Sequence, residues 1–312
     1  MADAQALEDH LKKLLLLFFL ITPPSYAVDL HVTIIQGLSG NPEFSELFDD
    51  QVRRLQQAAG QLVGKDLVTT FSGVDATRSN VLEYFEQLNS TLQADDRLAV
   101  IMIGHGSYDG HEYKFNVPGP DITGEDLAGI LAASPAGLQL IVNTSSASGA
   151  VIEQLKDDSR IIITATRSGS ERNAPRFGKF FVDALFSYSA DVNKNETISV
   201  AEAFEYANRE TEEFYEAEGR LATEHPQLEG EHAARFNIAR LTVRETVEND
   251  PQMEHLLTQK RNIDRLIEAL QLRKAEMSNE DYFNELQQLI LELSITEDMI
   301  EELQQDRAGN AD

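Results

Sequence analysis

Two short apolar stretches of the chain each end in residues that could carry chemistry. Residues 101–103 are apolar and precede His105 and Gly106, and residues 138–142 lead into a turn rich in hydroxyl groups, residues 143–149. Each stretch has the length and β-branched composition of a buried strand that ends in turn-forming residues. In an open parallel sheet, ligand and reaction sites lie outside the carboxyl ends of the strands. The sequence therefore predicts that one imidazole and one hydroxyl-lined turn meet at the same edge of a sheet.

The hydrophobic pattern predicts the elements that must position these two turns. Strand-like apolar runs alternate with segments of helical spacing, and repeated βα units of this kind imply a parallel sheet covered by helices on both faces. The predicted strands span residues 30–35, 66–71, 97–103, 138–143 and 160–166, and the predicted helices span residues 44–63, 78–93, 123–133 and 149–157. A turn signal at residues 108–111 predicts a β-hairpin. Residues 216–235 are polar and are expected to be irregular, and residues 234–243 are expected to supply a last strand.

At the two turns the chain resembles the caspase/legumain group of cysteine peptidases. In that group an apolar strand ends in His-Gly, and roughly forty residues later another ends in a small residue, Cys, any residue, Ser or Gly, and Gly. Ser148 and Gly149 match the end of the second motif, which puts Ser146 at the nucleophile position. The resemblance covers roughly residues 29–230 and implies a caspase-like, mostly parallel sheet of about six strands.

The resemblance implies a role for three residues. His105 would be the acid/base, Ser146 would be the attacking residue, and Gly106 would donate a backbone N–H to the oxyanion. A serine hydroxyl, unlike a thiolate, needs a base in direct contact and a third group that orients the base. Asp109 and Asp121 lie nearby in the chain, but the sequence assigns neither as that group. A site shaped for the larger thiol should turn over slowly with Ser, or not at all.

The chain contains no cysteine, which excludes disulfides, thiolate metal sites and a cysteine nucleophile in the chain as written. Either Ser146 is natural or a Cys was replaced there, and the uniformly hydroxyl-rich turn favours a natural Ser. Three functions follow as alternatives. The chain is a peptidase, or a peptide-binding scaffold module without turnover that assembles through its C-terminal helices, or a calcium-responsive adaptor.

Composition and charge limit the partners. The 312 residues, 42% hydrophobic and 25% charged, are enough for one sizeable core and a smaller appendage. The formal net charge of −27 argues against nucleic acid and anionic membranes as partners, because phosphate contacts need a basic surface. A peptide or protein is the expected ligand. The simpler interpretation of the negative charge is that it keeps the protein soluble.

The first 27 residues are similar to an export signal. Lys12 and Lys13 precede the apolar run 14–21, and Ser25 and Ala27 are the small residues of a cleavage site. The run is too short to span a bilayer, so no membrane span is expected after the signal is removed. The prediction is a periplasmic or secreted protein whose mature part begins with an α/β domain at residues 28–245. The alternative for residues 1–27 is a short buried helix.

Arg167 and Arg172 follow the last predicted strand of the alternating region, in a polar loop that could reach the same edge of the sheet. Guanidinium groups there would suit an acidic substrate side chain through bidentate pairing. The alternative is surface ion pairing with the abundant carboxylates.

Residues 191–202 have the spacing of an EF-hand-type calcium loop. The predicted ligands are Asp191, Asn193, Asn195, the Thr197 carbonyl and the bidentate Glu202, with Ser199 at the ninth position. Glu196 stands where Gly normally makes the sharp turn, and only two carboxylates would ligate, so modest affinity is expected. The alternative is an Asn- and Asp-rich turn that caps a helix at Ser199.

The pattern of residues 251–307 differs from that of the preceding domain and predicts two helices with heptad spacing. Apolar residues recur at sevens through Leu256, Ile263, Leu270 and Met277, and at alternating fours and threes from Tyr282 to Leu303. Two helices of nearly equal length joined by a tight turn predict an antiparallel coiled-coil hairpin. Its apolar seams would pack on the sheet domain or form a homodimer, and the sequence leaves both open.

Overall fold

The computed structural model describes residues 28–241, scattered residues between 255 and 271, and residues 273–308. Its centre is a six-stranded sheet with the order β10-β8-β7-β3-β1-β2, in which every neighbouring pair is parallel except β10 and β8. The strands are β1 (Leu30–Gln36), β2 (Val68–Phe71), β3 (Arg97–Ile103), β7 (Leu138–Asn143), β8 (Arg160–Thr164) and β10 (Gln227–Glu229). The predicted α/β class with a mostly parallel sheet of this size is confirmed.

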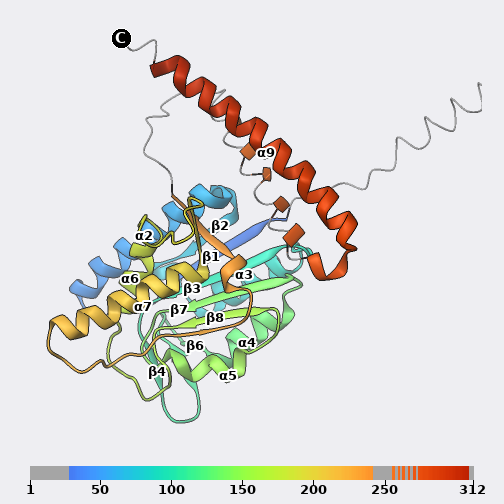
Figure 1. The fold of residues 1–312 in the computed structure, drawn as a ribbon. Helices are drawn as coiled ribbons and strands as arrows, with labels where there is room; N and C mark the ends of the chain where they lie inside the picture. The colour runs from blue at the N-terminus through green and yellow to red at the C-terminus, as the bar shows by residue number, and fades with distance from the viewer. Residues whose placement is uncertain are drawn as a thin grey trace, which may run out of the picture.

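Helices cover both faces of this sheet (Figure 1). One face packs against α2 (Pro42–Val63), α6 (Phe177–Ala184) and α7 (Val200–Ala217), and the other against α3 (Arg78–Asn89), α4 (Gly124–Ala133) and α5 (Ile152–Leu155). Strand alternation divides the apolar residues between the two cores. In β3, Ile101 and Ile103 belong to the first core, and Val100 and Met102 to the second. Burial on both faces explains why β3 reads as a continuous apolar run.

Two small sheets lie beside the main one. The first has the order β4-β5-β6 and contains β4 (Gly106–Tyr108), β5 (Tyr113–Phe115) and β6 (Ile122–Thr123), so the predicted hairpin is present. The second pairs β9 (Thr197–Ser199) with β11 (Asn237–Arg240). The last strand expected at 234–243 is present as β11, and it pairs with β9 rather than with the main sheet. One sequence expectation was wrong here, because the sixth main-sheet strand, β10, lies in the segment expected to be irregular. A half-buried run of three residues is too short to show a strand period.

The C-terminal hairpin is not confirmed. Its second predicted arm is the helix α9 (Asn279–Ala308), which lies outside the two helical layers in Figure 1. Part of the first predicted arm and the whole of the export signal at 1–27 lie outside the described residues. Leu256, Ile263 and Leu270 are buried, as their heptad positions predict. None of the described helices is both long and apolar enough to cross a membrane.

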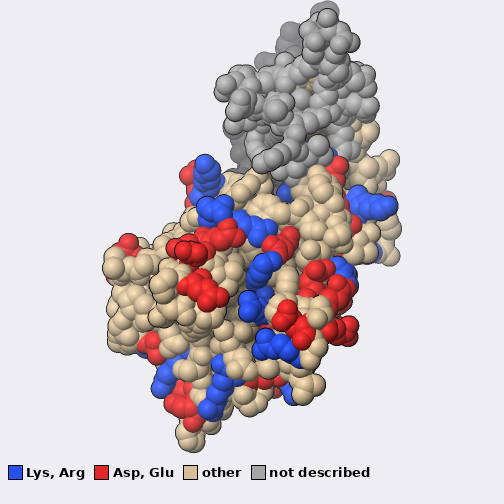
Figure 2. Space-filling model, turned by 90° about the vertical axis from the view of Figure 1, so that its left-hand side faces the viewer, with Lys and Arg blue, Asp and Glu red and all other residues tan. Residues whose placement is uncertain are grey.

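The surface carries both signs of charge. On the face that Figure 2 shows, acidic and basic side chains lie interspersed rather than gathered by sign. Such mixing at high net charge is typical of a surface that favours solubility.

Candidate functional site

The structure brings the two motif turns together at the carboxyl edge of the main sheet. β3 and β7 are parallel neighbours in which Met102 pairs with Asn143, so His105 and Ser146 follow at equal distances along the chain. The turns touch, because a Cβ atom placed on Gly106 would lie 2.6 Å from the Ser146 carbonyl oxygen. Only a glycine fits at that contact without displacing the second turn.

The His105 ring is held by backbone and aromatic contacts. Its Nε2 lies 3.1 Å from the carbonyl oxygen of Ser39, and its centroid lies 4.7 Å and 5.2 Å from those of Phe44 and Phe48 on α2. A carbonyl oxygen only accepts hydrogen bonds, so Nε2 carries the proton and the neutral ring leaves Nδ1 as the acceptor. The orienting group of this histidine is therefore a backbone carbonyl that follows β1.

The two aspartates near His105 in the sequence have other roles. The Asp109 carboxylate accepts the backbone N–H groups of His111 and Glu112 at the hairpin turn, and these bonds lower the pKa of Asp109 to about 2. Asp121 accepts from the Asn116 amide and the Val117 N–H. Both stabilise the β4-β5-β6 region, and neither is bonded to the imidazole.

Three of the four hydroxyls in the Ser146 turn, residues 144–149, are bonded inside the protein. The Thr144 hydroxyl donates to the Met102 carbonyl at 2.9 Å, the Ser145 hydroxyl to Asn143 Oδ1 at 2.8 Å, and that of Ser148 lies 3.2 Å from Thr166 Oγ1. The Ser146 hydroxyl bonds to no residue in the described part of the chain, including His105. Ser146 therefore carries the uncommitted hydroxyl, although its side chain is largely buried.

A buried polar network fixes the start of this turn. The Tyr113 hydroxyl lies 2.6 Å from Ser145 Oγ and accepts from Asn143 Nδ2 at 2.9 Å. Burial raises the pKa of Tyr113 to about 12, so the phenol stays neutral and can donate a hydrogen bond. These bonds hold the Ser145 side chain inside the protein.

The residue after Ser146 has an unusual backbone. Ala147 has φ 58° and ψ 11° and is completely buried. A left-handed conformation costs a residue with a Cβ about 1–2 kcal/mol, and such residues gather at functional sites. The loop between β8 and α6, residues 165–176, surrounds this turn. The Ala147 N–H donates to the Glu171 carbonyl oxygen of this loop, and the Gly149 N–H donates to its Thr166 Oγ1.

The Gly106 N–H points away from its neighbouring strand. In the β4–β5 ladder His105 accepts from the Asn116 N–H, and the Asp109 N–H donates to Glu112. Ladder bonds fall on alternate residues of an antiparallel pair, so they fall on the odd-numbered residues of β4. The Gly106 N–H is therefore directed to the opposite side of β4 from β5.

The two predicted arginines lie in the same region and are exposed. Arg167 Nε lies 3.2 Å from Glu171 Oε1, with the side chain 63% exposed. Arg172 Nη2 lies 3.4 Å from the Tyr108 carbonyl oxygen, which joins the loop to the His105 hairpin. Sequence reasoning missed Ser39, Glu171 and His225. His225 Nδ1 lies 2.6 Å from Glu171 Oε1.

The predicted calcium loop closes on itself through its oxygen atoms. The Asp191 carboxylate accepts the N–H groups of Asn195 and Glu196, and Asn195 Oδ1 accepts from Thr197. Glu202 Oε1 reaches back across the loop to the amide of Asn193 at 3.0 Å. Lys194 and Glu196 both have φ of 61°, so the sharp turn forms without glycine. Among the described residues no three His, Cys, Asp or Glu side chains gather as a metal cluster; the predicted ligands are instead mainly amides and a carbonyl.

Comparisons with known proteins name no family. No protein-family model matches the chain, and no curated protein matches it. Among solved structures it is similar to the crystal structure of protein GSU0716 from Geobacter sulfurreducens, with 12% identity and a TM-score of 0.44, over 64% of this chain and 92% of that one. A likeness this low carries no argument about function.

Proposed function

We propose that the carboxyl edge of the sheet is a peptidase-type site of the caspase/legumain kind, with Ser146 in place of the usual cysteine. The observation that carries the proposal is the Ser146 hydroxyl. It is the uncommitted one in a turn whose other hydroxyls are bonded, and the turn touches the His105 hairpin.

The chemistry would proceed in two stages. His105 Nδ1 accepts the Ser146 proton as the Ser146 oxygen attacks the peptide carbonyl, and the Gly106 N–H donates to the oxyanion. The imidazolium then gives its proton to the leaving amine, and water hydrolyses the acyl-enzyme. The Ser39 carbonyl would keep the ring oriented and stabilise its charged form. No bond joins His105 to Ser146 among the described residues, so the ring must shift when substrate binds, and turnover should be slow or absent.

The ligand would be a peptide or protein. The exposed guanidinium groups of Arg167 and Arg172 at the rim would favour an acidic side chain. The similarity of residues 1–27 to an export signal supports a periplasmic or secreted location. The apolar side chains exposed on α9 would offer a surface for a second copy.

The Ser146→Cys variant tests the site without knowledge of the substrate, because it introduces the chain's single thiol. If His105 acts on this position, the thiol pKa should fall by about 1–3 units below the usual value near 8.5. Alkylation by iodoacetamide, followed against pH, measures that pKa. His105→Ala should return it to the ordinary range and slow alkylation at pH 6.5 by about tenfold.

Ser145→Cys is the matched control, because Ser145 is buried in the Tyr113 network and its thiol should react slowly. A thiol pKa at position 146 that is the same with and without the His105→Ala substitution would contradict the peptidase proposal.

Peptide hydrolysis then separates the alternative functions. Activity that is lost in Ser146→Ala indicates a serine enzyme, and activity only in Ser146→Cys indicates a silenced or decayed cysteine peptidase. Peptide binding without turnover in every variant supports the scaffold module.

A second candidate function is calcium binding by residues 191–202. The left-handed backbone at Lys194 and Glu196, together with the reach of Glu202 across the loop, supports this proposal. Calcium at about 100 times its Kd should stabilise the fold by about 2.7 kcal/mol, which a thermal melt detects. Glu202→Gln should abolish the shift in melting temperature, and Glu205→Gln on the same helix should retain it. A shift that survives Glu202→Gln would remove the loop as its source.

A further inference from the structure

The N–H of the strained residue beside Ser146 donates to a backbone acceptor from the loop 165–176. Ala147 keeps its left-handed conformation inside the protein, and its N–H donates to the Glu171 carbonyl oxygen at 2.8 Å. Sparsely populated conformations of this kind persist only where the surroundings determine them. The direction of the Glu171 carbonyl therefore bears on the orientation of the neighbouring residue, Ser146.

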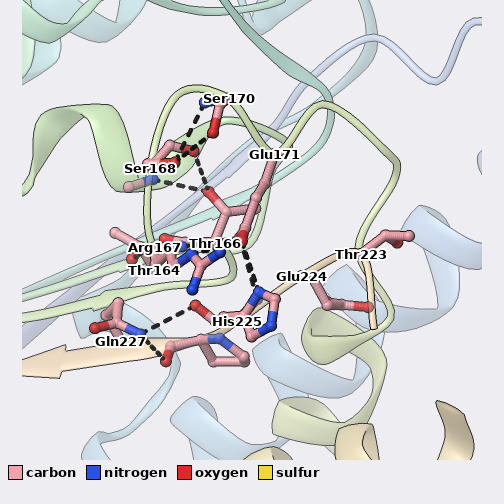
Figure 3. A network of polar contacts seen from close by, with 12 residues as sticks. Thr164, Thr166, Arg167, Ser168, Ser170, Glu171, Thr223, Glu224, His225 and Gln227 are labelled. Carbon is pink, nitrogen blue, oxygen red and sulfur yellow. Dashed lines mark hydrogen bonds and ion pairs between the residues drawn. The ribbon is translucent and has the colours of Figure 1, made fainter. Parts of the chain in front are cut away.

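The side chain of Glu171 fixes that carbonyl. Its carboxylate is 10% exposed and accepts from two residues (Figure 3). Oε2 accepts the N–H groups of Arg167 at 3.0 Å and His225 at 3.1 Å, while Oε1 lies 2.6 Å from His225 Nδ1 and 3.2 Å from Arg167 Nε. A nearly buried carboxylate that contacts four nitrogen atoms, two from each residue, has its hydrogen-bonding capacity satisfied and is held in one orientation.

His225 brings in a remote part of the chain. It precedes β10, and Gln227 Nε2 donates to its carbonyl oxygen. The adjacent Glu224 accepts the N–H groups of Arg176 and Phe177 at the start of α6. Two consecutive residues therefore tie down the loop 165–176, His225 near its middle and Glu224 at its end. The segment that leads into the sixth strand sets the shape of the loop around Ser146.

Thr166 holds the other side of the turn independently. Its N–H donates to Ser148 Oγ at 3.2 Å, and its hydroxyl accepts from the Gly149 N–H at 2.9 Å. Loss of the contact between Glu171 and His225 would leave these bonds in place. It would release Ala147 without unfolding the turn.

We propose that Glu171, locked by His225, is a positioning residue that holds the Ala147 peptide and thereby aims the side chain of Ser146. This rests on the proposed function for the role of Ser146, although the contact itself does not. Displacement of a reacting group by even a fraction of an ångström lowers reactivity, so the effect should appear at residue 146 rather than only in stability.

The test uses the thiol of the Ser146→Cys variant and the full chain. Adding Glu171→Ala or His225→Ala should slow its alkylation by iodoacetamide at pH 7 by about fivefold to tenfold and move its pH profile. His225→Asn should stay within about twofold, because the Asn amide can donate from nearly the position of Nδ1. Glu153→Ala, on an exposed carboxylate of α5, is the matched control and should change nothing.

Hydrogen exchange at the Ala147 amide gives a readout that needs no reactivity. Exchange should accelerate in Glu171→Ala and His225→Ala and stay slow in His225→Asn and Glu153→Ala. Unchanged alkylation and unchanged exchange in folded Glu171→Ala would overturn the proposal, and if that variant does not fold, Glu171→Gln decides on the same readouts. If His105→Ala leaves the thiol unaffected while Ala147 exchange still depends on Glu171, the proposed function fails and the role of Glu171 in holding this peptide stands.

Discussion

Gly149→Ala should lower the free energy of unfolding by about 3 kcal/mol or more. A Cβ atom on Gly149 would run into the backbone of Thr166, Arg167 and Ser168. Backbone cannot rotate away as the end of a side chain can, so either the Ser146 turn or the loop 165–176 must move. Both are anchored, the turn by Ala147 and the loop by Glu171. Urea unfolding of the parent and the variant measures the difference.

Gly129→Ala is the matched control for this substitution. Gly129 lies on an exposed face of α4, and an added Cβ meets no atom within 4 Å. Alanine is the better helix former, so this variant should gain about 1 kcal/mol. If Gly149→Ala kept the stability of the parent, the loop would not be packed on the turn, and the tie between the Ser146 turn and Glu171 would lose its structural basis.

Local patterns predicted the parts of the fold that depend on local sequence. The runs that became β3 and β7 are long, apolar and bounded by turn residues, so their type and ends could be read directly. The parallel direction of the strands and the helices on both faces followed from repeated βα units. The strand β10 was not predicted, because three residues with half-buried side chains show no alternation of apolar and polar positions. Its place at the edge depends on pairing with β8, which is a tertiary contact.

The candidate site divides in the same way. His105, Gly106 and Ser146 were found from strand ends and motif spacing. The carbonyl of Ser39 could not be found, since any residue supplies a carbonyl and only the fold decides which one faces the ring. The pair of Glu171 and His225 spans more than fifty residues of chain, and no spacing rule links them. Motif spacing therefore gives the candidate reacting groups, while the groups that contact them follow only from the packing of the folded chain.

Phe115→Ala should lower the free energy of unfolding by about 3–5 kcal/mol. The ring is completely buried on β5, and Cβ atoms placed on Gly37 and Gly104 would lie 3.0 Å and 2.9 Å from its Cζ atom. It therefore fills the space between the ends of β1 and β3, next to the segments that carry Ser39 and His105. Removing it leaves a cavity that two strand ends, fixed by the sheet, cannot close.

Two further substitutions test whether the loss of stability comes from the packing of the Phe115 ring. Phe115→Leu keeps most of the volume and should cost less than about 1.5 kcal/mol. Phe283→Ala removes the same side chain from a position on α9 that is 60% exposed, and should change stability by less than about 0.5 kcal/mol. Chemical denaturation with an unchanged m-value would assign the differences to the folded state. Equal losses in Phe115→Ala and Phe283→Ala would contradict the assignment, because a ring wedged between two strand ends and a ring in solvent cannot contribute alike.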